Sequence, residues 1–154
     1  MKYDLHSSPG PLIRRFHQIG LSIFAKEFKH TDTTPLQFSI LWTLNLNPDI
    51  DQITLAQMVA LDRTTCSNIV SRMEKKGELV RRVNPQNKRA KLVTLTATGK
   101  KLLKKVEGSM FKVQNKLLDP LSSKEKKIFL TCLQKLVDSN NELSRAPMLY
   151  MPLK

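Results

Sequence analysis

Apolar residues recur at intervals of three and four positions near both ends of the chain. These intervals place the side chains on one face of an α-helix, so they predict three long amphipathic helices. Each stripe also has the spacing of a coiled-coil seam, which packs against another helix. The stripes consist of Leu12, Phe16, Ile19 and Ile23; of Leu103, Val106, Met110, Val113 and Leu117; and of Phe129, Leu133 and Leu136.

Capping residues between these stripes predict further, shorter helices. Three segments read as capping boxes, in which a Ser or Thr is followed three positions later by Gln or Glu. They begin at Thr34, Thr54 and Ser122. Asp62 suits the cap of a helix over 63–76, and Gly77 suits its end.

The pattern becomes strand-like after that helix. The segments 79–83 and 91–95 are β-prone, and the stretch NPQNKRA between them contains Asn and Pro residues that favour turns. This arrangement predicts a β-hairpin with a long basic tip. A further helix is expected to open at Thr96.

The order of these elements predicts a mainly α fold with a small β-hairpin wing. A winged helix-turn-helix module would occupy residues 34–96, flanked by a helical dimerisation region built from residues 1–33 and 97–154. The apolar stripes could pack on one another within one chain. Because long flanking helices would then still expose apolar faces, we expect a second copy of the chain to cover them.

The net charge points to a polyanionic partner. The chain of 154 residues has 26 Lys and Arg against 13 Asp and Glu, a formal charge of +13 and a pI near 10.0. Residues 62–105 contain 13 of those cations and three acids, so they carry +10 of the charge. Cations of a membrane-surface protein would lie beside large exposed apolar residues on one helix, and that pattern is not evident. Duplex nucleic acid is therefore the favoured partner.

The sequence gives no indication of a membrane-bound or secreted protein. No apolar run approaches the ~20 residues of a membrane span, and the N-terminus lacks the apolar core of a signal peptide. We therefore expect a cytoplasmic protein. Cys66 and Cys132 are expected to be reduced thiols rather than a disulfide.

The segment DRTTCSNIVSRMEKKG is the candidate DNA-reading helix. Cys66, Ile69, Val70 and Met73 form its buried stripe, and small hydroxyls, an amide and cations form the opposite face. Small polar side chains allow a helix to enter the major groove and bond to base edges, with Asn favouring adenine. A merely solvated surface helix is the alternative. The basic hairpin that follows favours DNA, because an Arg on a protrusion can enter the minor groove.

The expected DNA contacts come from this helix and from the hairpin. Thr64, Thr65, Ser67 and Asn68 are expected to carry sequence preference, while Arg72 and Lys75 hold phosphates. The full set is Arg63, Thr64, Thr65, Ser67, Asn68, Ser71, Arg72, Lys75, Arg82, Lys88, Arg89 and Lys91. A constitutive basic protein that binds RNA, or DNA architecturally, is the alternative, although a helix cannot enter the groove of duplex RNA.

Features of an enzyme or a metal protein are absent from the sequence. There are five Gly, no GxGxxG and no P-loop pattern, and the three histidines all lie in the first 30 residues. His17 has no potential ligand four positions later, as a helical metal site would need. No cofactor is expected.

Three blocks of the chain resemble the MarR family of bacterial regulators. They are TPLQFSILWTL, TLAQMVALDRTTCSNIVSRMEKKGELVRR and NKRAKLVTLTATGKKLL. The resemblance implies a homodimer whose terminal helices interlock, a pseudo-palindromic operator, and release by a small molecule, often an aromatic acid. Three features depart from the family pattern: Asn87 replaces the usual Asp of the wing, Ala60 replaces a frequent Gly, and no Cys precedes Cys66.

Candidate effector-binding residues lie in the first two helices. Cations beside aromatic surface would suit a carboxylate on a planar ring, or its thioester, since Arg can bind carboxylates through two hydrogen bonds. The alternative is that the aromatics are core and the arginines are solvated. The set is Arg14, Arg15, His17, Phe24, Phe38 and Trp42.

Overall fold

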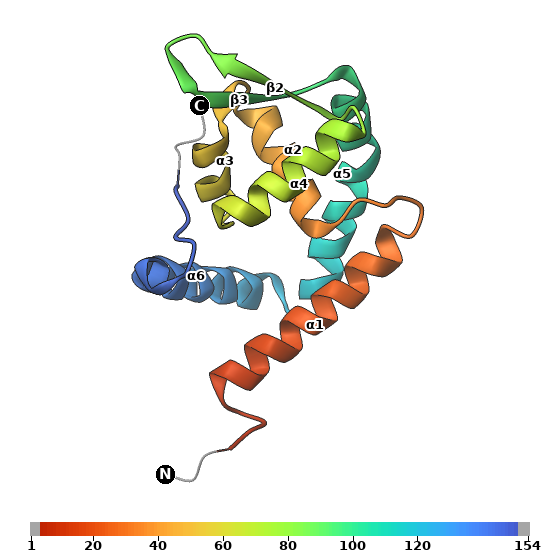
Figure 1. Ribbon diagram of the computed structural model, residues 1–154. Helices are drawn as coiled ribbons and strands as arrows, with labels where there is room; N and C mark the ends of the chain where they lie inside the picture. Colours follow the sequence, from red (N-terminus) through yellow and green to blue (C-terminus); the bar gives the residue numbers. More distant parts are fainter. Residues whose placement is uncertain (1–3, 151–154) are drawn as a thin grey trace. The chain divides into compact units, whose positions relative to one another are not determined.

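The computed structural model describes residues 4–150, and its elements follow the expected order with one additional strand (Figure 1). The chain divides into two compact units: Met1–Asp32 with Val106–Phe129, and Thr33–Lys105 with Leu130–Lys154. The elements are α1 (Pro9–Glu27), α2 (Pro35–Leu46), β1 (Ile50–Asp51), α3 (Gln52–Met58), α4 (Arg63–Lys75), β2 (Leu79–Asn84), β3 (Asn87–Leu95), α5 (Ala97–Leu118), α6 (Ser123–Asn140) and the short 3-10 helix η1 (Asn141–Leu143).

The first unit is helical and joins α1 to the C-terminal part of α5. Phe24 stacks on Phe28 with ring centroids 3.9 Å apart, and Phe16 meets Phe129 edge to face at 5.7 Å. The Lys116 ammonium lies 2.7 Å from the Glu27 carboxylate. This unit therefore has its own aromatic and ionic contacts between distant parts of the chain.

The predicted stripe on α5 is buried or half-buried at every position, whereas those on α1 and α6 are only partly covered within a single chain. On α1, Phe16 and Ile23 are partly buried, whereas Leu12 and Ile19 keep 50% and 44% of their surface exposed. No residue of α6 is buried, and Leu133 and Leu136 remain exposed. Apolar surface of this kind is available for a second chain.

The second unit contains a three-stranded antiparallel sheet in the order β1-β3-β2. Helices α2, α3 and α4 pack against one another and against the hairpin. The core of the unit is almost fully buried, at 0–1% exposure. It consists of Ile40, Leu41, Leu44, Leu55, Cys66, Val70, Met73 and Val93.

Two of the three predicted capping boxes are confirmed, and the predicted end of α4 is confirmed too. Thr34 Oγ1 accepts from the backbone N–H of Gln37 at 3.2 Å, and Gln37 Oε1 accepts from that of Thr34 at 2.8 Å. Ser122 and Glu125 make the same reciprocal pair. Gly77, just after α4, has φ of 71°, a left-handed conformation that glycine adopts without steric cost.

The prediction of a capping box that begins at Thr54 is wrong. The helix begins earlier, because the Asp51 carboxylate accepts from the backbone N–H groups of Ile53 and Thr54, both at 3.0 Å. Thr54 thus lies inside α3 and donates its hydroxyl to Asp51 at 2.5 Å. An ionised carboxylate at this position satisfies two otherwise unpaired N–H groups, so Asp51 and not Thr54 fixes the start of α3.

The prediction of a long hairpin tip is also wrong. Strand β3 begins at Asn87, so only Pro85 and Gln86 form the turn, and Lys88 and Arg89 lie in the strand. The pairing is regular from Leu79 opposite Leu95, with a register shift next to the turn. The turn of the wing is therefore shorter than the sequence suggests, and β1 adds a short third strand to the hairpin.

Candidate nucleic-acid interface

Helix α4 presents the predicted polar face to solvent. Its opposite side is anchored by Cys66, Val70 and Met73, each 0% exposed. The amphipathic spacing thus fixes which face points outward. The exposed residues of the predicted set on α4 are Arg63, Thr64, Asn68, Arg72 and Lys75, and Ser67 and Ser71 are half-buried beside them.

The start of α4 is set by Asp62 and Thr65. One carboxylate oxygen of Asp62 accepts from the Thr65 backbone N–H at 2.9 Å, and the other accepts from the Thr65 hydroxyl at 2.8 Å. These two hydrogen bonds hold the pKa of Asp62 below its usual range. The Thr65 hydroxyl proton is therefore already used, which leaves this residue only acceptor capacity toward a base.

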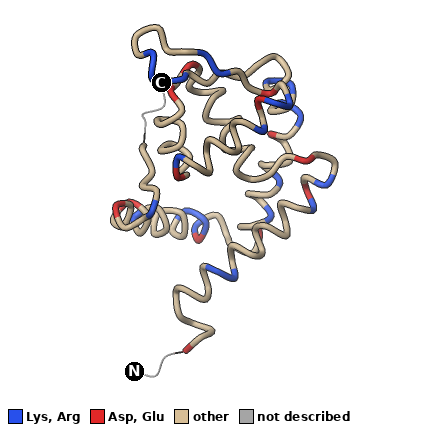
Figure 2. Tube along the Cα trace, in the orientation of Figure 1, with Lys and Arg blue, Asp and Glu red and all other residues tan. Residues whose placement is uncertain are grey.

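The hairpin carries its predicted cations on exposed strand positions. Lys88, Arg89 and Lys91 are exposed, and the backbone N–H of Arg89 donates to the Asn87 side chain at 3.1 Å. Asn87 thus supports the strand locally through its amide oxygen. Lys and Arg residues occur along this ribbon and onward into α5 (Figure 2).

Arg82 differs from the other hairpin cations. Its guanidinium lies 2.6 Å from the Asp49 carboxylate, and its side chain is 57% exposed. Asp49 also accepts from the Thr94 hydroxyl. Part of the charge of Arg82 is therefore balanced within the protein.

The structure brings α4 and the hairpin together at one hollow of about 320 Å³. Ser67 lines it from α4, and Arg89 and Lys91 line it from β3. Gln52 and Ile53, in the first turn of α3, complete the other side. Residues expected to read DNA from separate sequence segments thus share a surface.

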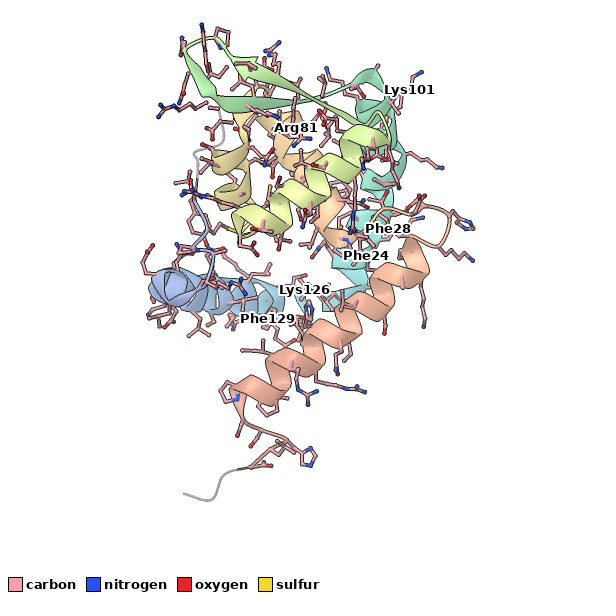
Figure 3. All side chains as sticks on the ribbon, viewed as in Figure 1. Phe24, Phe28, Arg81, Lys101, Lys126 and Phe129 are labelled. Carbon is pink, nitrogen blue, oxygen red and sulfur yellow. The ribbon has the colours of Figure 1, made fainter. Side chains whose placement is uncertain are left out.

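Arg81, one of the cations counted on the hairpin, has an internal partner instead. Its Nε and Nη2 donate to Glu74 Oε2 at 3.0 and 2.5 Å, and its backbone N–H donates to Glu74 Oε1 at 3.0 Å. The side-chain hydrogen bonds from Arg81 lower the pKa of Glu74. This pair joins the reading helix to the wing, and its Arg81 is labelled in Figure 3. Glu74 is the single acid within α4, which is the sequence signal that could have found it.

The candidate effector residues fall into two groups. Arg14, Arg15 and His17 are exposed on α1, and Phe24 of the same unit is buried against Phe28. In the other unit, Phe38 stacks on Trp42 with ring centroids 5.9 Å apart. Both aromatic pairs have core-like contacts within their own units, and a role in effector binding stays a prediction.

Within residues 4–150 no three His, Cys, Asp or Glu side chains are grouped so that they could hold a metal ion. No helix in that same range is both long and apolar enough to cross a membrane.

Comparisons with known proteins identify relatives of similar length. A model described as the MarR family matches residues 33–91. The transcriptional regulator HosA of Escherichia coli O111:H- is 28% identical over 108 residues, which are 70% of this chain and 80% of HosA. The HTH-type transcriptional repressor NicR of Pseudomonas putida is 26% identical over 138 residues, 90% of this chain and 87% of NicR.

A solved structure of a transcriptional regulator also resembles this chain. The PcaV transcriptional regulator from Streptomyces coelicolor, determined with its natural ligand, is 29% identical. Its TM-score is 0.83, and the match covers 90% of this chain and 97% of PcaV. The winged helical architecture predicted from the sequence is confirmed by this similarity.

Proposed function

We propose that this chain is a MarR-type transcriptional repressor that is released by a small aromatic acid; the MarR family model matches its residues 33–91, and the relatives that it resembles are transcriptional regulators. The observation that carries the DNA-reading part is the outward face of α4. Small polar side chains lie there between cations, beside the exposed Arg89 and Lys91 of the wing. The repressor role is supported by the similarity to NicR, which is named a repressor.

In this proposal DNA binding and dimerisation belong to different parts of the chain. Residues 34–96 bind the duplex, with Thr64, Ser67 and Asn68 at base edges and Arg72 and Lys75 at phosphates. Residues 1–33 and 97–154 dimerise through the apolar surface that α1 and α6 leave exposed. A two-fold symmetric protein requires a pseudo-palindromic operator, with half-site centres about 10–10.5 bp apart or a multiple of that. We place the protein in the cytoplasm, where its DNA lies.

The contribution of the wing is tested by Arg89→Ala. Loss of one minor-groove or phosphate contact in each subunit should weaken binding strongly and reduce the slope of log affinity against log salt by about one per contact, and so by about two for the dimer. Gel-shift titrations at several salt concentrations measure both. Lys29→Ala, in the loop after α1, removes the same charge from an exposed position that lies on neither α1 nor α6 and outside the proposed DNA interface, and serves as the control. Equal affinity and slope for both variants would remove the wing from the mechanism.

The alternative of a constitutive nucleic-acid binder is tested by competition. A protein that reads the major groove should be displaced by duplex DNA and poorly by duplex RNA of the same sequence, because the deep groove of RNA excludes a helix. Equal displacement by both would favour the alternative.

The effector part of the proposal is supported by the cations of α1 and by the ligand-bound state of PcaV. A ligand releases DNA only if it binds the DNA-free arrangement more tightly than the DNA-bound one. A panel of aromatic acids and their thioesters, tested by thermal shift and by release of DNA, should contain such a ligand. Failure of every acid to release DNA, or release that is unchanged in an Arg14→Ala, Arg15→Ala, His17→Ala variant, would contradict this assignment.

A further inference from the structure

The beginning of α5 carries four exposed lysines that the proposed interface does not include. Lys100, Lys101, Lys104 and Lys105 occupy its first turns, and its first turn has no acidic residue (Figures 2 and 3). We call these residues the α5 lysine cluster. Across the described range 4–150, no ion pair joins any of them to a carboxylate.

This placement is unfavourable for the isolated helix. The N-terminal end of a helix carries partial positive charge, so cations in the first turn are destabilising, and in α5 this cost falls mainly on Lys100. The pairs Lys100 with Lys104 and Lys101 with Lys105 are four positions apart, which places like charges side by side. A bound polyanion would remove both costs.

The cluster lies beside the end of the reading helix, within one compact unit. The Thr96 hydroxyl donates to the Gly77 carbonyl at 2.6 Å and accepts from the Gly99 backbone N–H at 3.1 Å. A Cβ at Gly99 would stand 2.1 Å from the Glu78 carbonyl oxygen, so only glycine allows this approach. The start of α5 is thereby held against the segment that follows Lys75, the last residue of α4.

We propose that the α5 lysine cluster is a second phosphate-contacting surface, which binds the backbone of duplex DNA without reading its sequence. This inference rests on the proposed function. The cluster contains only Lys, whose compact charge suits phosphate but gives little directional recognition. Residues 97–105 expose no aromatic or large apolar side chain, and Leu103 is buried. Protein interfaces are instead enriched in aromatics and depleted of Lys, so a DNA backbone fits this surface better than an acidic protein.

The test replaces the cluster in one variant, Lys100→Gln with Lys101→Gln, Lys104→Gln and Lys105→Gln. Gln has nearly the helix propensity of Lys, so the fold should be kept. A control with the same loss of charge carries Lys26→Gln, Lys29→Gln, Lys124→Gln and Lys127→Gln, all exposed positions. Binding to operator and to random duplex is measured at several salt concentrations.

The cluster variant should lose about 0.9 from the salt slope for each phosphate contact removed, so about 3 or more in total. At about 0.1 M salt its affinity should fall at least about tenfold, by the same factor for both duplexes. The paired variants Lys100→Gln with Lys104→Gln and Lys101→Gln with Lys105→Gln should each show part of the loss. In the absence of DNA, the melting temperature of the cluster variant should rise, because the unfavourable charges are gone.

Three results distinguish failure of the α5 lysine cluster from failure of the proposed function. A wild-type protein that binds DNA normally, with the same slope in the cluster and control variants, overturns the cluster alone. Retained DNA affinity together with lost binding to an acidic polypeptide would assign the cluster to a protein partner and also overturn it. A wild-type protein that binds no duplex overturns the proposed function and this inference with it.

Discussion

The ion pair between Arg81 and Glu74 should couple the stability of the reading helix to that of the wing. The Arg81 side chain is 17% exposed and that of Glu74 is 34% exposed. Exposed pairs contribute about 0.2–1 kcal/mol, while removing one partner of a buried pair costs about 3–5 kcal/mol. This pair lies between those limits and has two charge-assisted side-chain hydrogen bonds. We therefore expect a coupling energy of about 1–2 kcal/mol.

The coupling is measured with a double-mutant cycle. Urea unfolding of the wild type, Glu74→Ala, Arg81→Ala and the double variant gives four free energies of unfolding, taken at one protein concentration because a dimer is expected. Arg81→Ala should also weaken DNA binding, since it releases the wing from α4. A coupling below about 0.3 kcal/mol, within the usual error of additivity, would refute the reasoning.

The same cycle has a predictable dependence on pH. Arg81 lowers the pKa of Glu74 in the folded protein below its ordinary value. The stability that this carboxylate contributes is therefore fully present above the ordinary pKa and is lost as the pH falls through the folded one. The coupling should be complete at pH 7 and should shrink at strongly acid pH. A coupling that stays constant into that range would show that the carboxylate charge is not its source.

Three further experiments test local features. Cys66 is fully buried, and burial raises its pKa to about 11. A thiol reagent at neutral pH should therefore react quickly with the exposed Cys132 and not with Cys66. Fast labelling of a Cys132→Ser variant would contradict this expectation. Ala60 has φ of 51°, a left-handed conformation that glycine adopts more easily than alanine. Ala60→Gly should therefore raise the free energy of unfolding by up to about 1 kcal/mol. A clear decrease would show that the turn is not strained. Asp62→Ala should lower the free energy of unfolding by about 1 kcal/mol, while Asp62→Asn should keep most of the helix cap. Equal losses of stability in the two variants would argue against the capping role.

Periodicity and capping were enough to predict most of the fold. The helices at Pro35, after Asp62 and after Ser122 begin at the expected residues, because each start is fixed by bonds between near neighbours. The start of α3 was missed because two capping candidates stand three positions apart. Asp51 prevails through a carboxylate that serves two N–H groups at once.

The hairpin could not be read as fully from the sequence. Lys88 and Arg89 have no apolar alternation that marks a strand, yet β3 includes them, within the register shift between the pairs Val83–Lys91 and Asn84–Asn87. Strand β1 has two residues and is defined only by its pairing with Val93 and Leu92. Both features depend on contacts between distant segments, which local patterns do not encode.

In the candidate interface, too, local patterns predict some features, whereas others depend on contacts between distant segments. Exposure of Thr64, Asn68 and Arg72 follows from the helical period alone. The internal role of Arg81 does not, because strand alternation gives a residue its side of the sheet but not its partner. Its pairing with Glu74 needs the packing of α4 against β2.

Selection of bound sequences from a random duplex pool tests the central claim most directly. The wild-type protein should enrich a motif with two-fold symmetry and half-sites about one helical turn, or a multiple of it, apart. An Asn68→Ala variant should select a motif relaxed at one base position per half-site, with about 1–3 kcal/mol of discrimination lost there if Asn68 makes a two-bonded contact. Enrichment of no motif by the wild type, or of an identical motif by the variant, would contradict sequence reading by α4.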